Sequence, residues 1–90
     1  MAKTNDELFD AFAARVAEIL RERFGMDPEA LLRTHRDSFT VDGLIRRSDG
    51  GSEWHRVKAT PEQLQWNGPN AMAEAFVEEY VAAFRNAGGA

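Results

Sequence analysis

The sequence contains no cysteine, and this absence removes several kinds of site at once. A disulfide framework, a zinc site built on thiolates and a cysteine nucleophile are all excluded. No apolar run is long enough to cross a bilayer, and the first ten residues are polar and acidic where a signal peptide would be basic and then apolar. We therefore expect a cytoplasmic protein with no membrane contact.

Motifs that carry catalysis are missing as well. The glycines at positions 50 and 51 precede a predicted strand and lack the G-x-G-x-x-G pattern, so they favour a turn over a phosphate-binding loop. His35 and His55 lack the paired spacing of metal ligands on one helix. The carboxylates that could join them are Asp37, Asp42 and Glu53. We expect a non-enzymatic protein with no cofactor and no bound metal.

The length and composition are those of a small globular protein, and its charges are unevenly distributed along the chain. Ninety residues with 43% hydrophobic and 29% charged residues predict a single domain over residues 1–90, with fraying at 1–4 and 87–90. The net charge of −4 is unevenly distributed, because residues 33–58 carry six basic and four acidic side chains, a balance of +2. A basic middle segment between two acidic ends is the first indication of a binding surface.

Two longer segments, one at each end of the chain, have the 3.6-residue periodicity of amphipathic helices. The first begins at a capping box formed by Thr4 and Glu7 and ends at Gly25, which suits a left-handed C-cap. A short helix follows, with Asp27 as its N-cap and Leu32 on its inner side.

The connection over residues 60–70 has two interpretations. Thr60 followed by proline predicts a helix of about one turn, whereas a short third strand over residues 63–66 is the alternative. Asn70 is expected to cap the last helix. Trp66, which directly precedes a turn, is expected to fill one end of the core.

The resulting order is long helix, short helix, hairpin, short connection and C-terminal helix, which is an α+β fold. Both long helices have wide apolar faces, so we expect them to pack on one face of the sheet. A two-stranded sheet is marginal by itself. The third strand over residues 63–66 or a second subunit would extend it, and we favour a homodimer.

Residues 38–59 change to a period of two and predict an antiparallel β-hairpin. A three-residue loop over residues 49–51 pairs Arg47 with Glu53 and Ile45 with His55. A two-residue turn would exchange the faces of one strand and bring two charges into the core, which is unfavourable. The predicted apolar face consists of Phe39, Val41, Gly43, Ile45, His55, Val57 and Ala59. The predicted polar face consists of Thr40, Asp42, Leu44, Arg46, Trp54, Arg56 and Lys58.

This polar face is the candidate binding surface. Guanidinium and ammonium groups bind carboxylates and phosphates, and an exposed tryptophan is a typical anchor of protein interfaces. We predict that it binds an acidic protein partner or a second copy of the chain, and that Trp54→Ala or Arg56→Glu weakens binding without unfolding the protein. The predicted partner-binding residues are Leu44, Arg46, Arg47, Trp54, Arg56 and Lys58.

Two other functions are compatible with parts of the sequence. A nucleic-acid-binding accessory protein could use the same cationic and aromatic face. The pI of about 5.1 for the whole chain is, however, far below the value of about 9 that is typical of such binders. A small-ligand-binding module with a pocket near Trp54 and Trp66 is the third interpretation.

Overall fold

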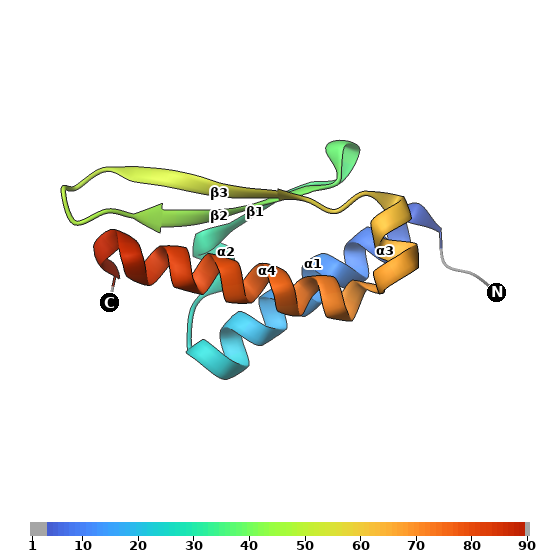
Figure 1. Ribbon diagram of the computed structural model, residues 1–90, viewed down its shortest axis with the longest axis horizontal. Helices are drawn as coiled ribbons and strands as arrows, with labels where there is room; N and C mark the ends of the chain where they lie inside the picture. Colours follow the sequence, from blue (N-terminus) through green and yellow to red (C-terminus); the bar gives the residue numbers. More distant parts are fainter. Residues whose placement is uncertain (1–3, 90) are drawn as a thin grey trace.

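A three-stranded antiparallel sheet has its helices on one side in the computed structural model, which describes residues 4–89 (Figure 1). The fold is α+β, as predicted. Residues 1–3 and 90, where part of the fraying was expected, lie outside the described residues. The elements are α1 (Asn5–Phe24), α2 (Pro28–Leu31), β1 (Leu32–His35), the 3-10 turn η1 (Arg36–Ser38), β2 (Thr40–Arg46), β3 (Ser52–Lys58), α3 (Pro61–Asn67), α4 (Pro69–Phe84) and the wide turn η2 (Arg85–Gly89).

Most helix ends follow the signals in the sequence. Thr4 and Glu7 form the expected capping box, in which the Thr4 hydroxyl accepts from the Glu7 amide at 3.2 Å. Gly25 ends α1 with a φ of 63°, a conformation that favours glycine. Asp27 caps α2, and Thr60 caps α3 in a second capping box. These local predictions are confirmed because each cap is specified by neighbouring residues alone.

The start of the last helix is one correction. Gly68 is the N-cap and α4 begins at Pro69, so Asn70 lies inside the helix and does not cap it. Proline is preorganised for the first helical position, which moves the start ahead of the asparagine. The Asn70 side chain instead accepts a hydrogen bond from Arg15 Nε at 2.7 Å and so links α4 to α1.

The third strand lies elsewhere than expected. Residues 63–66 belong to α3, where Leu64 is buried in the core and Trp66 is 89% exposed. Both the strand alternative and the core position of Trp66 are therefore wrong. The third strand is β1, which follows the single turn of α2 and pairs antiparallel with β2, Leu32 lying opposite Gly43. The free edge of β2 recruits this segment, which sequence periodicity had assigned to the end of a helix.

The hairpin differs from the predicted pairing by two residues. Arg46 lies opposite Ser52, and the Arg47 amide donates to the Gly51 carbonyl at 2.8 Å, so the loop is residues 48–50. Gly50 supplies the left-handed position with a φ of 89°. A shift of two residues preserves the side-chain alternation. The alternation of the two predicted faces is therefore confirmed although the pairs are not, and Arg46 at the end of β2 also lines a groove beside α4.

The apolar face of the sheet packs on the two long helices. Val41 and Ile45 are buried there among aromatic side chains of α1 and α4. Gly43 lies directly under Tyr80, and a Cβ at this position would be 2.5 Å from the tyrosine ring. The Tyr80 hydroxyl donates to the Leu44 carbonyl at 2.7 Å, and burial raises its pKa to about 12. This contact fixes α4 against β2. None of the helices within residues 4–89 covers the opposite face of the sheet (Figure 1).

Candidate functional site

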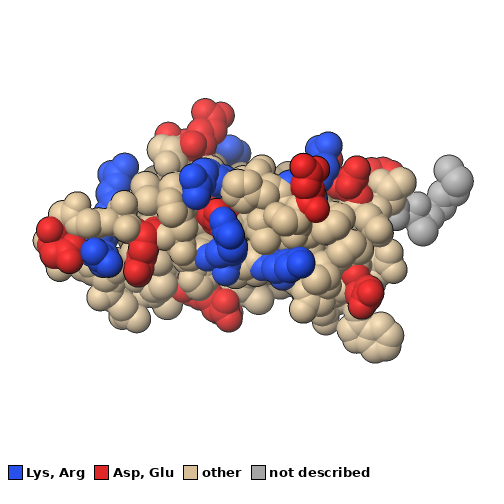
Figure 2. Space-filling view, turned by 90° about the horizontal axis from the view of Figure 1, so that it is seen from above, with Lys and Arg blue, Asp and Glu red and all other residues tan. Residues whose placement is uncertain are grey.

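The face of the sheet opposite the helices carries the candidate site, and we call it the outer face. Figure 2 looks onto this side of the molecule and shows lysine and arginine side chains near its centre, with acidic side chains around its margins and toward its ends. Alternation along the paired strands directs ten residues to this side, of which Thr40, Arg46 and Ser52 lie at strand ends. The other seven form the site, and they are Arg33 and His35 of β1, Asp42 and Leu44 of β2, and Trp54, Arg56 and Lys58 of β3.

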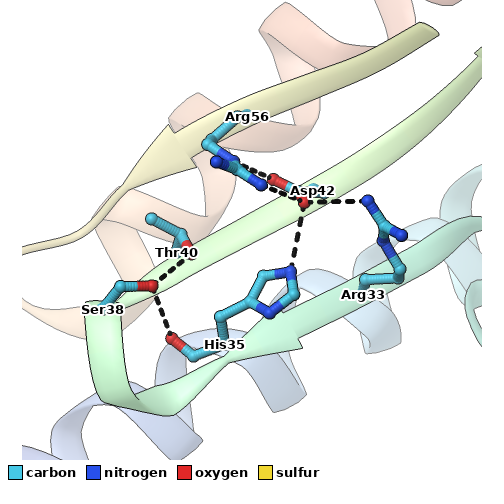
Figure 3. A network of polar contacts seen from close by, with 6 residues as sticks. All are labelled: Arg33, His35, Ser38, Thr40, Asp42 and Arg56. Atoms are coloured by element: carbon cyan, nitrogen blue, oxygen red, sulfur yellow. Dashed lines mark hydrogen bonds and ion pairs between the residues drawn. The ribbon is translucent and has the colours of Figure 1, made fainter.

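Asp42 occupies the centre of the outer face and is completely buried, with 0% of its surface exposed. Arg56 binds it through two hydrogen bonds, from Nε to Oδ1 at 2.7 Å and from Nη2 to Oδ2 at 3.0 Å (Figure 3). From the other side, Arg33 Nη2 lies 3.4 Å and His35 Nε2 lies 3.2 Å from Oδ2. The carboxylate is thus covered by cationic side chains from both neighbouring strands.

These contacts determine the protonation of Asp42. The hydrogen bonds from Arg56, joined by the contact with His35, lower the pKa of Asp42 to about 2 against the opposing effect of burial. The same bonds raise the pKa of Arg56. Asp42 is therefore an anion throughout the physiological range, and its charge changes only in acid. Its role in this geometry is to hold the surrounding cations in place.

The polar contacts continue at one end of β2. The hydroxyl oxygens of Ser38 and Thr40 are 2.8 Å apart, and the Ser38 hydroxyl donates to the His35 carbonyl at 3.4 Å (Figure 3). Within residues 4–89 no hydrogen bond joins the Ser38 hydroxyl to the imidazole of His35. A serine activated by a histidine base is thus not assembled here.

Trp54 is the apolar part of the outer face. Its side chain lies on β3 opposite the half-buried Leu44 and is 39% exposed. The guanidinium carbon of Arg33 is 3.8 Å from the centroid of the indole ring, which is the geometry of a cation–π contact. Since Arg33 also reaches Asp42, one arginine connects the indole to the buried carboxylate and restrains both.

Four of the six predicted partner-binding residues share the outer face: Leu44, Trp54, Arg56 and Lys58. Arg46 follows the same alternation at the end of β2, and Arg47 lies beyond the strand. Arg46 lines a groove beside α4, and the Nε atom of Arg47 is 3.3 Å from Asp49 Oδ1 in the hairpin loop.

Sequence reasoning missed two members of the outer face, Arg33 and His35. They alternate with Leu32 and Thr34 in β1, and this period of two was the signal that could have identified a strand. It also missed that Asp42, although correctly placed on this face, is buried under its neighbours. Predicting that requires the positions of side chains on two flanking strands.

Residues 4–89 also show whether a metal site or a membrane-spanning helix is present and where His55 lies. No group of three histidine, aspartate or glutamate side chains within residues 4–89 could hold a metal ion. His55 lies on the apolar face, with its ring centroid 5.9 Å from that of Phe76 and its Nε2 4.0 Å from Glu79 Oε2. Over the same residues, no helix combines the length and apolar character needed to cross a membrane.

Comparison with known proteins gives no further guide to the site. No family model matches the chain, and neither curated proteins nor solved structures show a match to it. Function therefore has to be inferred from the chemistry of the molecule itself. The outer face combines the exposed indole of Trp54, the cationic side chains of Arg33 and Arg56, and the buried carboxylate of Asp42, which holds the arginines in place.

Proposed function

We propose that the protein is a non-enzymatic interaction module whose outer face binds an acidic surface of a protein partner. The observation that supports it best is Trp54, an indole that is 39% exposed on a sheet face that no helix of the described chain covers. Burying a large aromatic side chain is a major source of binding free energy, and tryptophan is enriched among the residues that dominate interfaces. The half-buried Leu44 beside it enlarges the apolar contact area.

The side chains of the site are also ordered in the absence of a partner. Arg33 stacks on Trp54 and contacts Asp42, which restrains the indole in one orientation. A side chain that is already ordered loses less conformational entropy on association. This arrangement supports Trp54 as the anchor of the interface.

The charges favour a protein over a nucleic acid. Arg33, Arg56 and Lys58 against Asp42 leave the outer face cationic, which complements an acidic protein surface. However, the guanidinium of Arg56 is already bound to Asp42 through two hydrogen bonds. Phosphate binding needs several available cations, and the chain as a whole carries a net charge of −4.

A second copy of the chain is one partner of this kind. β3 is an edge strand in the sheet order β1-β2-β3, so its outer edge can pair with another strand. The acidic segments that flank residues 33–58 would also complement the outer face of another copy. Self-association through this region would make the protein a homodimer.

The test compares the two exposed tryptophans. Light scattering at about 100 µM protein measures self-association, and calorimetry measures binding to a synthetic peptide rich in Asp and Glu with a central Leu-Phe pair. We expect Trp54→Ala to weaken whichever interaction is observed by about tenfold or more, the range of an interface hot spot. Trp66→Ala is the matched control, because Trp66 is 89% exposed on α3, outside the outer face.

Lys58→Glu is the charge variant of choice. The Arg56→Glu substitution that the sequence suggested would place a second carboxylate against the buried Asp42 and so perturb the fold. Equal losses for Trp54→Ala and Trp66→Ala would contradict the proposal, as would a monomer that does not bind the peptide. Binding to a mixed-sequence oligonucleotide, with an affinity that falls steeply as the salt concentration rises, would show that the partner is a nucleic acid and not a protein.

A further inference from the structure

A groove of about 430 Å³ opens on a part of the molecule that the proposed function does not use. It lies between the end of α1, the turn of α2, the last residue of β2 and the end of α4. Its apolar lining includes Met26, Leu31, Val81 and Phe84, which are buried or half-buried. The volume falls within the range of roughly 300–1,000 Å³ that is typical of small-molecule sites. Neither tryptophan lines it, so this is a different place from the pocket expected near Trp54 and Trp66.

Two arginines border this apolar lining. Arg46 is the last residue of β2 and Arg85 the first of η2, and these two elements contact each other. Over residues 4–89 neither arginine forms an ion pair, whereas Arg23 and Arg56 each bind a carboxylate through two hydrogen bonds. Two exposed arginines without a carboxylate partner in the described chain thus lie beside an apolar surface, and the guanidinium carbon of Arg85 is 5.8 Å from the centroid of the Phe24 ring in the same lining.

The lining has one acidic side chain, Asp27, against these two arginines, which leaves one positive charge in excess. Asp27 caps α2 and accepts a hydrogen bond from the Glu29 amide at 3.1 Å. Its carboxylate is thereby engaged at a helix start, where the backbone amides favour an anion. The groove therefore combines an apolar interior with a net positive border.

We propose that this groove binds a small amphiphile with an alkyl chain and an anionic head group. The chain would lie along Leu31, Val81 and Phe84 and bury apolar surface there. The head group would lie between Arg46 and Arg85, since guanidinium groups bind carboxylates and phosphates through paired charge-assisted hydrogen bonds. A free fatty acid and an alkyl phosphate share this chemistry. The inference is independent of the outer face and of any protein partner.

Nuclear magnetic resonance tests the site directly. Decanoate, decyl phosphate, decanol and decyltrimethylammonium are titrated below their micelle concentrations into the ¹⁵N-labelled protein, and amide shifts are mapped. We expect the two anionic amphiphiles to shift residues 24–31, 46 and 81–85, and to bind about tenfold or more tightly than decyltrimethylammonium. Which anion binds more tightly distinguishes a carboxylate from a phosphate head group.

Substitutions identify the groups that recognise the anion. The double variant Arg46→Gln with Arg85→Gln should lose about tenfold or more in affinity for decanoate and keep its affinity for decanol. The pair of lysine substitutions at the same positions should restore part of the loss, which separates charge from folding. Arg21→Gln is the matched control, because Arg21 is exposed on α1 and does not line the groove.

Three results would overturn the inference. The first is an absence of shifts with decanoate at about 1 mM, a concentration at which even weak specific sites fill. The second is a map of shifts that lies on the outer face or spreads over the whole molecule. The third is equal binding of decanoate and decyltrimethylammonium, which would leave the arginines without a role.

Discussion

Val41 and Asp42 are neighbours in the chain, and both side chains are completely buried, but they are buried in different ways. Val41 points toward the helices and is covered by apolar side chains of the core. Asp42 points to the outer face and is covered by the long side chains of Arg33, His35 and Arg56. On one strand, Val41 is thus buried by apolar packing and Asp42 is buried by charged side chains. The stability contributed by burial by packing should be insensitive to pH, while the stability contributed by Asp42 should depend on the ionisation of its carboxyl group.

Ile45→Ala should have the largest effect on stability, because it removes buried apolar volume from the face that Val41 shares. We expect a loss of about 3 kcal/mol in the free energy of unfolding, from lost transfer energy and the cavity that remains. Urea denaturation at neutral and at acidic pH measures it. The loss should be the same at both pH values, and a strong pH dependence would contradict burial by packing.

Asp42→Asn should have the next largest effect. The pKa of Asp42 is lowered from 3.8 to about 2 in the folded protein, and a shift of this size corresponds to roughly 2 kcal/mol of stability at neutral pH. We expect the variant to lose about that amount in urea denaturation, because Asn keeps the shape but not the charge that binds Arg56.

The sign of the pH dependence follows from the lowered pKa. Ionised Asp42 stabilises the folded state above its unfolded pKa, and this contribution disappears as the pH falls through the folded pKa. The difference between the natural chain and Asp42→Asn should therefore shrink between about pH 5 and about pH 2. Comparing the two proteins cancels the contributions of Asp49 and Glu74, whose pKa values are also lowered. A difference that stays constant over this range would show that charge does not hold Asp42 in place.

Arg33→Gln should have the smallest effect on stability, about 0.5 kcal/mol, because its contacts with Asp42 and Trp54 are partly exposed. Its effect on the indole should be clearer than its effect on unfolding. In a Trp66→Phe background, tryptophan fluorescence reports Trp54 alone, and acrylamide should quench it more strongly once the guanidinium is absent. Arg21→Gln provides the control, and unchanged quenching would mean that Arg33 does not cover the ring.

Much of the fold could be predicted because the signals are local. The caps at Thr4, Asp27 and Thr60 depend on residues within one turn of each other, and the two faces of the hairpin follow from its period of two. The strand β1 could not be predicted in this way. Its four residues follow a helical turn directly, and they form a strand because β2 offers a free edge. That is a tertiary effect which overrides local preference.

The candidate site was predictable in its composition but not in its organisation. The sequence placed Leu44, Trp54, Arg56 and Lys58 on one face, and the paired strands confirm this. It could not show that Arg56 is bound to Asp42, because that contact depends on the exact pairing of β2 with β3. It also could not show that Arg33 comes to cover Trp54, since this depends on a strand that was assigned to a helix.

The packing of α1 against α4 also has a consequence for how the chain folds. The three strands are joined by short connections and can meet early, since contacts between near neighbours in sequence form fastest. The apolar side of the sheet is closed, however, by a helix that precedes the strands and a helix that follows them. During synthesis on the ribosome, a nascent chain that has reached only α3 would expose the apolar side of α1, and the complete core would form only after α4 has emerged.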